Sequence, residues 1–167
     1  TATIGGRLRL TDLSYLAQEP RPIWGPVRLP DDLDRVRILS HLASALDALH
    51  GQGLVVGDLS FGNVLWSAAP LGVMLIDCDG IHPERGRSVM PQADTLDWHD
   101  PHAGVDPPDR DRDRYKLSLA ILRVLSRTLS SVPEQADSLE LRVPRELDSP
   151  IRALLARAAG ERGSRPT

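Results

Sequence analysis

An aspartate, an asparagine and a second aspartate lie at the ends of short apolar runs in this sequence. Asp58 closely follows one run, Asn63 lies five residues later, and Asp77 directly follows the run that ends at Ile76. Carboxylate and amide oxygens are the hard ligands that Mg²⁺ prefers, and a carboxylate can orient a hydroxyl group for attack. The residue types therefore predict a phosphoryl-transfer site in which Asp58 orients a hydroxyl nucleophile. Asn63 and Asp77 would hold magnesium on a nucleotide.

The apolar runs beside these residues are short and rich in β-branched side chains. They cover residues 54–56, 64–66 and 73–76, and turn-forming stretches separate them. This pattern predicts three short strands without intervening helices. A loop between the first two strands can turn Asp58 and Asn63 into one cleft, and we expect Gly62 to supply the backbone angles that this loop needs.

Two helices are predicted on either side of this candidate site. Acidic residues from Asp31 form a first turn, and apolar residues recur at helical spacing until His50, where glycines end the pattern. Helical spacing resumes with Tyr115 and extends through Leu129, and Asp109, Asp111 and Asp113 precede it. Residues 77–109 are polar and lack periodicity, so we expect a long loop there.

A third helix is predicted near the end of the sequence. Ser149 is expected as its cap, Pro150 as its first residue and Gly160 just after its last residue. Residues 1–30 alternate in polarity and then become rich in proline, which predicts short strands and loops that act as a connector.

The composition limits the classes of partner. The chain has 23 acidic and 20 basic residues and lacks the clustered positive charge that nucleic-acid binding needs, so we expect no nucleic-acid partner. No apolar segment approaches the ~20 residues that a membrane span needs. The single cysteine, Cys78, excludes an internal disulfide. We therefore expect a cytoplasmic domain without a membrane span.

The order and gaps of the candidate residues resemble the C-terminal lobe of the protein-kinase-like fold. The resemblance implies that Asp58 is the catalytic-loop aspartate and that Asn63 and Asp77 bind the metal of an ATP–Mg²⁺ complex. Asp113, followed by Arg-Tyr-Lys-Leu, resembles the aspartate that starts the long central helix and holds the catalytic-loop backbone by hydrogen bonds. Arg165, followed by Pro-Thr, resembles a structural arginine near the end of the lobe. The implied cofactors are ATP and Mg²⁺.

Two stretches are similar to a divergent bacterial group of Ser/Thr kinase-like domains. They are G-D-L-S-x-x-N at residues 57–63 and I-D-C-D at residues 76–79. The implied fold is mainly α, an α+β kinase C-lobe in which a helical bundle carries short β-hairpins and the catalytic loop. Residues 31–167 would form this lobe. Residues 1–30 would be a hinge or the remnant of a connector to an N-lobe that is absent from this chain.

Two departures from the family concern the catalytic loop. Val56 and Gly57 stand where the family usually has His-Arg. Without that arginine we expect no clamp for a phosphorylated activation loop, so phosphorylation at Ser88 or Thr95 should not activate the protein. Ser60 stands where protein kinases usually have a phosphate-contacting lysine, which weakens the electrostatic support of the transition state.

Two more departures follow Asp77. The Asp-Phe-Gly motif appears as Asp77-Cys78-Asp79, and the Ala-Pro-Glu motif appears as Asp100-Pro101-His102. Asp100 is therefore a candidate partner for Arg165. We expect Asp79 to be a turn residue and Cys78 to be an inert buried thiol.

A glycine-rich phosphate loop and a nucleotide-binding lysine are both missing from the sequence. Lys116 is the only lysine, and it lies in a predicted C-terminal helix. We expect the missing N-lobe to precede Thr1 in a longer polypeptide and to act in cis. The 167-residue chain alone should then bind nucleotide weakly and transfer phosphate poorly.

Three functional classes remain open at this point. The first is an ATP-dependent Ser/Thr protein kinase that transfers the γ-phosphate to a protein hydroxyl. The second is a small-molecule kinase of the aminoglycoside or choline type, and Asp113 and Arg165 favour the protein-kinase side. The third is a pseudokinase that binds nucleotide or partners without catalysis, favoured by the missing His-Arg, lysine and phenylalanine.

Overall fold

The computed structural model describes residues 2–4, 7–24, 29–84, 95–104 and 107–166. The strands are β1 (Ala2–Ile4), β2 (Arg7–Arg9), β3 (Thr11–Asp12), β4 (Leu54–Val55), β5 (Val64–Ala68), β6 (Leu71–Leu75) and β7 (His82–Pro83). The α-helices are α1 (Asp32–Gly51), α2 (Arg110–Ser126) and α3 (Arg145–Ala158). The short 3₁₀ helices within these ranges are η1 (Leu13–Tyr15), η2 (Pro22–Trp24), η3 (Cys78–Gly80) and η4 (Pro133–Ser138).

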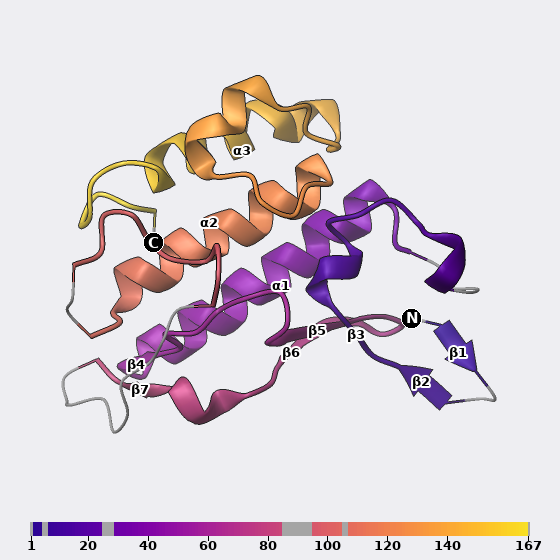
Figure 1. The fold of residues 1–167 in the computed structure, drawn as a ribbon, viewed down its shortest axis with the longest axis horizontal. Helices are drawn as coiled ribbons and strands as arrows, with labels where there is room; N and C mark the ends of the chain where they lie inside the picture. The colour runs from indigo at the N-terminus through magenta and orange to yellow at the C-terminus, as the bar shows by residue number, and fades with distance from the viewer. Residues whose placement is uncertain (1, 5–6, 25–28, 85–94, 105–106, 167) are drawn as a thin grey trace.

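The two long helices, α1 and α2, run side by side in opposite directions (Figure 1). His50 at the end of α1 contacts Asp113 at the start of α2, and Arg127 just after α2 pairs with Asp32 at the start of α1. Helix α3 covers the side of α2 that faces away from α1, and the hairpin of β5 and β6 lies along the other side of α1 (Figure 1). Helix α2 is therefore the central element of the fold.

Helix α1 follows directly from its sequence. Asp31 caps it, and its carboxylate accepts a hydrogen bond from the Asp34 backbone N–H at 2.8 Å. Ile38, Leu42 and Leu46 repeat every fourth residue and are all buried, which is the spacing of a single helix face. His50 continues this face by one more turn and is also buried. The predicted bounds of this helix are confirmed.

The predicted strands form small antiparallel sheets joined by turns. In the largest, β3 pairs with β5 and β5 pairs with β6, so that Val64 lies opposite Leu75. A separate pair, β4 and β7, places Val55 opposite His82. The short strand β7 interrupts the segment that the sequence predicted as an unbroken loop.

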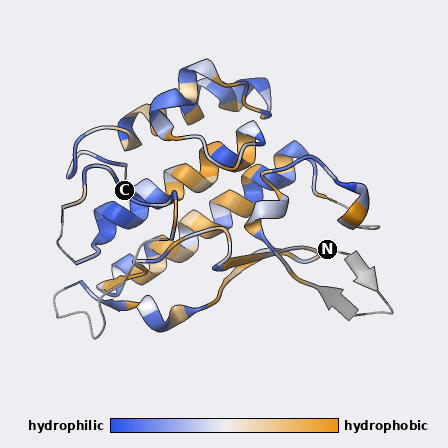
Figure 2. Ribbon diagram, in the orientation of Figure 1, coloured by the Kyte–Doolittle hydropathy of each residue, from blue (hydrophilic) through white to orange (hydrophobic). Residues whose placement is uncertain are grey.

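The core lies between α1, α2 and the β5–β6 hairpin. Figure 2 shows the apolar residues concentrated on these elements, whereas α3 is largely polar. Leu13 and Leu16 from the N-terminal region are fully buried in the same core as Ile38. The boundary expected at residue 31 therefore does not coincide with a break in packing. The largest fully buried side chains are Trp66, Arg123, Tyr115, Lys116, Leu13, Leu16, Ile38, Leu42, Leu59, Leu119, Leu122 and Leu125.

Helix α2 differs at both ends from its predicted bounds. It begins at Arg110, and Asp109 caps it by accepting a hydrogen bond from the Arg112 N–H at 2.9 Å. Asp113 therefore lies in the first turn instead of starting the helix. The helix ends at Ser126 because Arg127 adopts a left-handed conformation with φ of 56°, so Leu129 lies outside it.

Helix α3 begins earlier than the sequence predicted. Pro144 occupies its N-cap position, and Pro150 lies inside the helix instead of at its first position. Ser149 is consequently a helical residue and not the cap. A proline this close to the start removes one backbone hydrogen bond, which the rest of the helix tolerates.

The fold is mixed α+β with small sheets, as the α+β part of the expectation predicts. Across the described residues, no helix combines the length and the apolar character that crossing a bilayer requires.

Candidate functional site

Asp58 and Asn63 meet in the loop between β4 and β5. The Asn63 side-chain amide donates hydrogen bonds to the Asp58 backbone carbonyl at 2.8 Å and to Asp58 Oδ2 at 3.2 Å. The Asn63 amide nitrogen binds Asp58, so the amide oxygen, Oδ1, faces away from Asp58. The structure thus brings these two predicted residues together.

Asp77 adjoins Asn63 through the backbone of the β5–β6 hairpin. The Ile76 N–H donates to the Asn63 carbonyl at 3.0 Å, and Asp77 is the next residue. Its φ and ψ are both 54°, a left-handed conformation that few residues other than glycine adopt. Its carboxylate is exposed and does not cap the 3₁₀ turn that follows. Such backbone strain is concentrated at functional positions, because surrounding structure must hold it.

A tight turn at Gly57 orients the start of this loop. The Asp58 N–H donates to the Val56 carbonyl at 2.9 Å, and Gly57 between them has φ of 75°. Only glycine adopts that angle without steric cost. The sequence predicts this role for Gly62, but Gly62 has no such positive φ, so that prediction is wrong.

Asp113 holds the same turn from helix α2. Its side chain is fully buried and accepts hydrogen bonds from the N–H of Val56 and the N–H of Gly57, both at 2.8 Å. His50 Nε2 lies 2.9 Å from Asp113 Oδ2 and provides a third contact. The hydrogen bonds to the loop backbone expected of Asp113 are therefore present, although its place in the helix differs.

Lys116, one helical turn after Asp113, reaches the opposite side of the Gly57 peptide. Its Nζ donates to the Gly57 carbonyl at 2.7 Å and lies 3.8 Å from Asp58 Oδ1. The lysine side chain is fully buried, whereas 24% of the Asp58 side chain is exposed. A cation therefore lies behind the carboxylate that the sequence identified as the catalytic candidate.

A hydroxyl group of the chain contacts the same carboxylate from the segment that precedes α2. Thr95 Oγ1 donates to Asp58 Oδ1 at 2.9 Å. Asp58 thus has both its oxygens engaged, Oδ1 by Thr95 and Oδ2 by Asn63. Ser88, the other residue considered with Thr95, lies outside the described residues.

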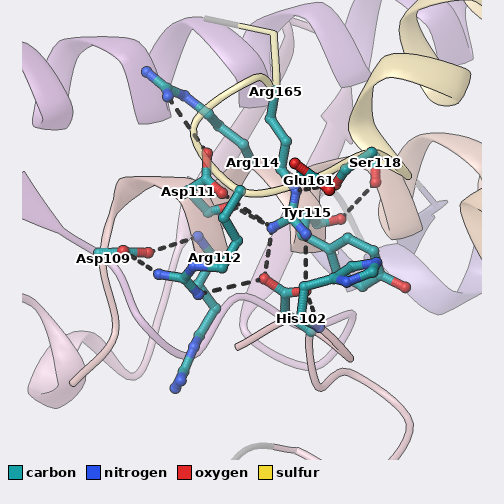
Figure 3. Close-up of polar contacts among 12 residues, drawn as sticks. His102, Asp109, Asp111, Arg112, Arg114, Tyr115, Ser118, Glu161 and Arg165 are labelled. Atoms are coloured by element: carbon teal, nitrogen blue, oxygen red, sulfur yellow. Dashed lines mark hydrogen bonds and ion pairs between the residues drawn. The ribbon is translucent and has the colours of Figure 1, made fainter. Parts of the chain in front are cut away.

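Arg165 is held by Asp100, which lies outside the loop between β4 and β5. Its two terminal nitrogens donate to the two Asp100 oxygens at 2.5 and 2.9 Å, and both side chains are fully buried. Arg165 also donates to the Asp111 carbonyl at 3.1 Å and lies over the Tyr115 ring at 4.9 Å (Figure 3). Asp100 is the partner that the sequence indicated for Arg165. The pair joins the C-terminal segment to the residues that precede α2.

The surroundings of this ion pair shift the pKa of Asp100 and the pKa of the neighbouring Tyr115. Burial raises the pKa of Asp100, but hydrogen bonds from Arg165 and the His102 N–H, with the charges of Arg165 and Arg162, outweigh it. The pKa of Asp100 therefore lies below its ordinary value. Burial, assisted by the charges of Glu134 and Asp100, raises the pKa of Tyr115 to about 12.

The donor set at the loop fits a magnesium ion bound together with a nucleotide. Mg²⁺ in such sites takes one or two protein oxygens and fills its other positions with water and phosphate oxygens. Asn63 Oδ1 and the exposed Asp77 carboxylate supply two such oxygens on adjoining backbone positions. Among the described residues, no group of three or more His, Cys, Asp or Glu side chains could hold a metal ion by itself. A metal bound here would thus depend on the nucleotide for its remaining ligands.

Some residues near the site were missed or misjudged from the sequence. The sequence assigns no role to Lys116 except that it cannot be the nucleotide-binding lysine. Its spacing of three residues from Asp113 nevertheless places both side chains on one face of α2. Cys78 was expected to be buried and is exposed. Asp79 is an exposed residue of the 3₁₀ turn, as predicted.

No protein-family model matches this chain, and no curated protein matches it. Its function is therefore argued from the geometry of the site, since a fold by itself does not define an activity.

Proposed function

We propose that this chain is the C-lobe of an ATP- and Mg²⁺-dependent phosphotransferase that resembles bacterial Ser/Thr protein kinases. The substrate would be a hydroxyl group on a protein or a small molecule. An N-lobe in cis would supply the other half of the nucleotide site. This proposal joins the family resemblance to the geometry of the loop between β4 and β5.

The observation that carries the proposal is the hydroxyl contact on Asp58. The Thr95 hydroxyl donates to Asp58 Oδ1 at 2.9 Å, which is the distance at which a carboxylate orients a hydroxyl nucleophile. Asn63 holds the other carboxylate oxygen and so limits its rotation. The loop therefore presents Asp58 with one carboxylate oxygen held by Asn63 and the other in contact with a hydroxyl group.

Asp58 would orient the acceptor hydroxyl and take up its proton as the new phosphorus–oxygen bond forms and ADP leaves. Asn63 and Asp77 would hold the magnesium ion, which when bound counters the negative charge of the phosphates. Asp113 would keep the loop in place through its hydrogen bonds to Val56 and Gly57.

One observation favours a second candidate, a pseudokinase that binds nucleotide or a partner without catalysis. Lys116, the only lysine in the sequence, is fully buried, so this chain offers no exposed lysine to nucleotide phosphates. Catalysis would then require that the N-lobe or the arginines supply the positive charge.

Transfer of labelled γ-phosphate from ATP by the full-length protein separates these candidates. The variants are Asp58→Ala and Asp77→Ala, and Asp79→Asn serves as a control because Asp79 is an exposed carboxylate of the same turn. We expect Asp58→Ala to lose on the order of 10²-fold or more in rate. Asp77→Ala should lose Mg²⁺-dependent transfer, and Asp79→Asn should remain active. Mg²⁺–ATP binding without transfer in the wild type would favour the pseudokinase, whereas unchanged rates in both alanine variants would refute the enzymatic proposal.

A further inference from the structure

We propose that Lys116 is a positioning residue for Asp58. The inference rests on the proposed function, because it assigns a role in phosphoryl transfer. It starts from two contacts of one buried ammonium group, at 2.7 Å to the Gly57 carbonyl and at 3.8 Å to Asp58 Oδ1.

Asp113 and Lys116 contact the two peptide groups on either side of Gly57. Asp113 accepts the Gly57 N–H at 2.8 Å, and Lys116 donates to the Gly57 carbonyl. The two side chains are three residues apart on α2, so they project from the same face of the helix. A negative and a positive group thus fix the donor and the acceptor of one residue in a tight turn.

Lys116 also lies close to the Asp58 side chain and so affects its direction. Asp58 directly follows the fixed Gly57, and Lys116 attracts its Oδ1 from the buried side. Thr95 and Asn63 contact the carboxylate as well. Lys116 is the positively charged member of this set, and it belongs to the rigid central helix of the fold.

Burial of the Lys116 ammonium group has a cost in free energy. A buried ammonium is unfavourable unless it is paired, and an apolar side chain of similar volume would fill the same space at lower cost. The lysine side chain is fully buried. A role at the partly exposed Asp58 carboxylate explains why a lysine occupies this buried position.

The test is a double-mutant cycle in the full-length protein, with γ-phosphate transfer as the measurement. Lys116→Met removes the charge at similar volume, Asp58→Asn removes the carboxylate charge, and the third variant combines both. We expect Lys116→Met to lower kcat on the order of 10²-fold with little change in the KM for ATP, as displacement of a reacting group does. In the Asp58→Asn background the same substitution should change kcat little, because Lys116 acts through Asp58.

A second variant guards against loss of folding. Lys116→Gln keeps a donor for the Gly57 carbonyl but has no charge, and circular dichroism shows whether each variant folds. We expect Lys116→Gln to fold and to lose activity nearly as Lys116→Met does. Full activity of Lys116→Gln, or an equal loss in both Asp58 backgrounds, would assign Lys116 a purely structural role and overturn the proposal. Failure of both variants to fold would overturn it in the same way.

The cycle also separates this inference from the proposed function. Loss of transfer in Asp58→Asn with full activity in Lys116→Met would keep the function and reject the positioning role. A wild-type protein that transfers no phosphate would reject the function, and the positioning role with it.

Discussion

Arg165 and Asp100 form a bidentate ion pair between segments 65 residues apart in sequence, and neither side chain is exposed. Arg165 also donates to the Asp111 carbonyl, which lies in the first turn of α2. The pair therefore ties the C-terminal segment to the beginning of the helix that carries Asp113 and Lys116. It thus stabilises the part of α2 that supports the candidate site.

Removal of both partners should destabilise the protein by less than the sum of the two single removals. Arg165→Met leaves the Asp100 carboxylate buried without its partner, which costs about 3–5 kcal/mol of unfolding free energy. Asp100→Leu combined with Arg165→Met leaves neither member of the pair buried without the other, so its loss should be smaller than the sum of the two single losses. Urea unfolding of the three variants gives these values. Strictly additive losses would show that the two residues do not act as a pair.

The stability that Asp100 contributes should disappear at low pH. The pKa of Asp100 is lowered in the folded chain, so between the folded and the unfolded values the folded state binds fewer protons, and acidification favours unfolding. The contribution is complete above the ordinary value of 3.8 and is lost as pH falls through the folded value. Unfolding free energies of the wild type and Asp100→Asn should therefore differ at pH 6 and converge below about pH 4. A difference that stays constant over this range would contradict the assignment.

Asp113→Asn should loosen the loop that carries Asp58. The carboxylate accepts from Val56, Gly57 and His50, and an amide can present only one oxygen to these groups. We expect a loss of at least about 2 kcal/mol in unfolding free energy and faster amide exchange at Val56 and Gly57.

The matched control for this variant is Asp109→Ala, which removes the cap of the same helix. It should cost about 1 kcal/mol and leave amide exchange at Gly57 close to that of the wild type. Equal exchange rates at Gly57 in the two variants would show that Asp113 supports only the helix.

Negative charge at Thr95 should inhibit the proposed reaction instead of activating it. The Thr95 hydroxyl contacts Asp58 Oδ1 at 2.9 Å, so a carboxylate or phosphate at this position repels the Asp58 carboxylate. Thr95→Glu should therefore lower γ-phosphate transfer by the full-length protein, whereas Thr95→Ser, which keeps the hydroxyl, should remain active. A large gain in activity from Thr95→Glu, or from phosphorylation of Thr95, would contradict this expectation.

Elements specified by local chemistry could be predicted from the sequence. The cap at Asp31 and the apolar repeat that follows fixed both ends of α1, and the β-branched runs indicated β4, β5 and β6. The pairings of Asp113 with the loop and of Arg165 with Asp100 were predicted from the resemblance to the kinase-like fold, which implies which distant segments meet. Whether these residues perform the roles of their counterparts in kinases stays a prediction.

The features that escaped prediction depend on tertiary contacts. The sequence offers Gly57 and Gly62 equally as flexible residues, and only the tight turn from Val56 to Asp58 shows which one needs a positive φ. Pro150 has the sequence signature of a helix start, but packing of α3 against η4 and α2 extends the helix before it. The contact of Lys116 with Asp58 requires the loop to fold back on α2, which no local pattern specifies.

Asn63 and Asp77 are proposed to hold the metal of a bound nucleotide beside Asp58. Mn²⁺ can replace Mg²⁺ as an oxygen-bound ion, and its unpaired electrons broaden the NMR signals of nearby nuclei. In the isotope-labelled full-length protein, Mn²⁺ with ATP should broaden the Asn63 side-chain amide and the backbone amides of Asp58 and Asp77, and Asp77→Asn should weaken this effect. Broadening confined to other parts of the chain, or unchanged in Asp77→Asn, would contradict the account.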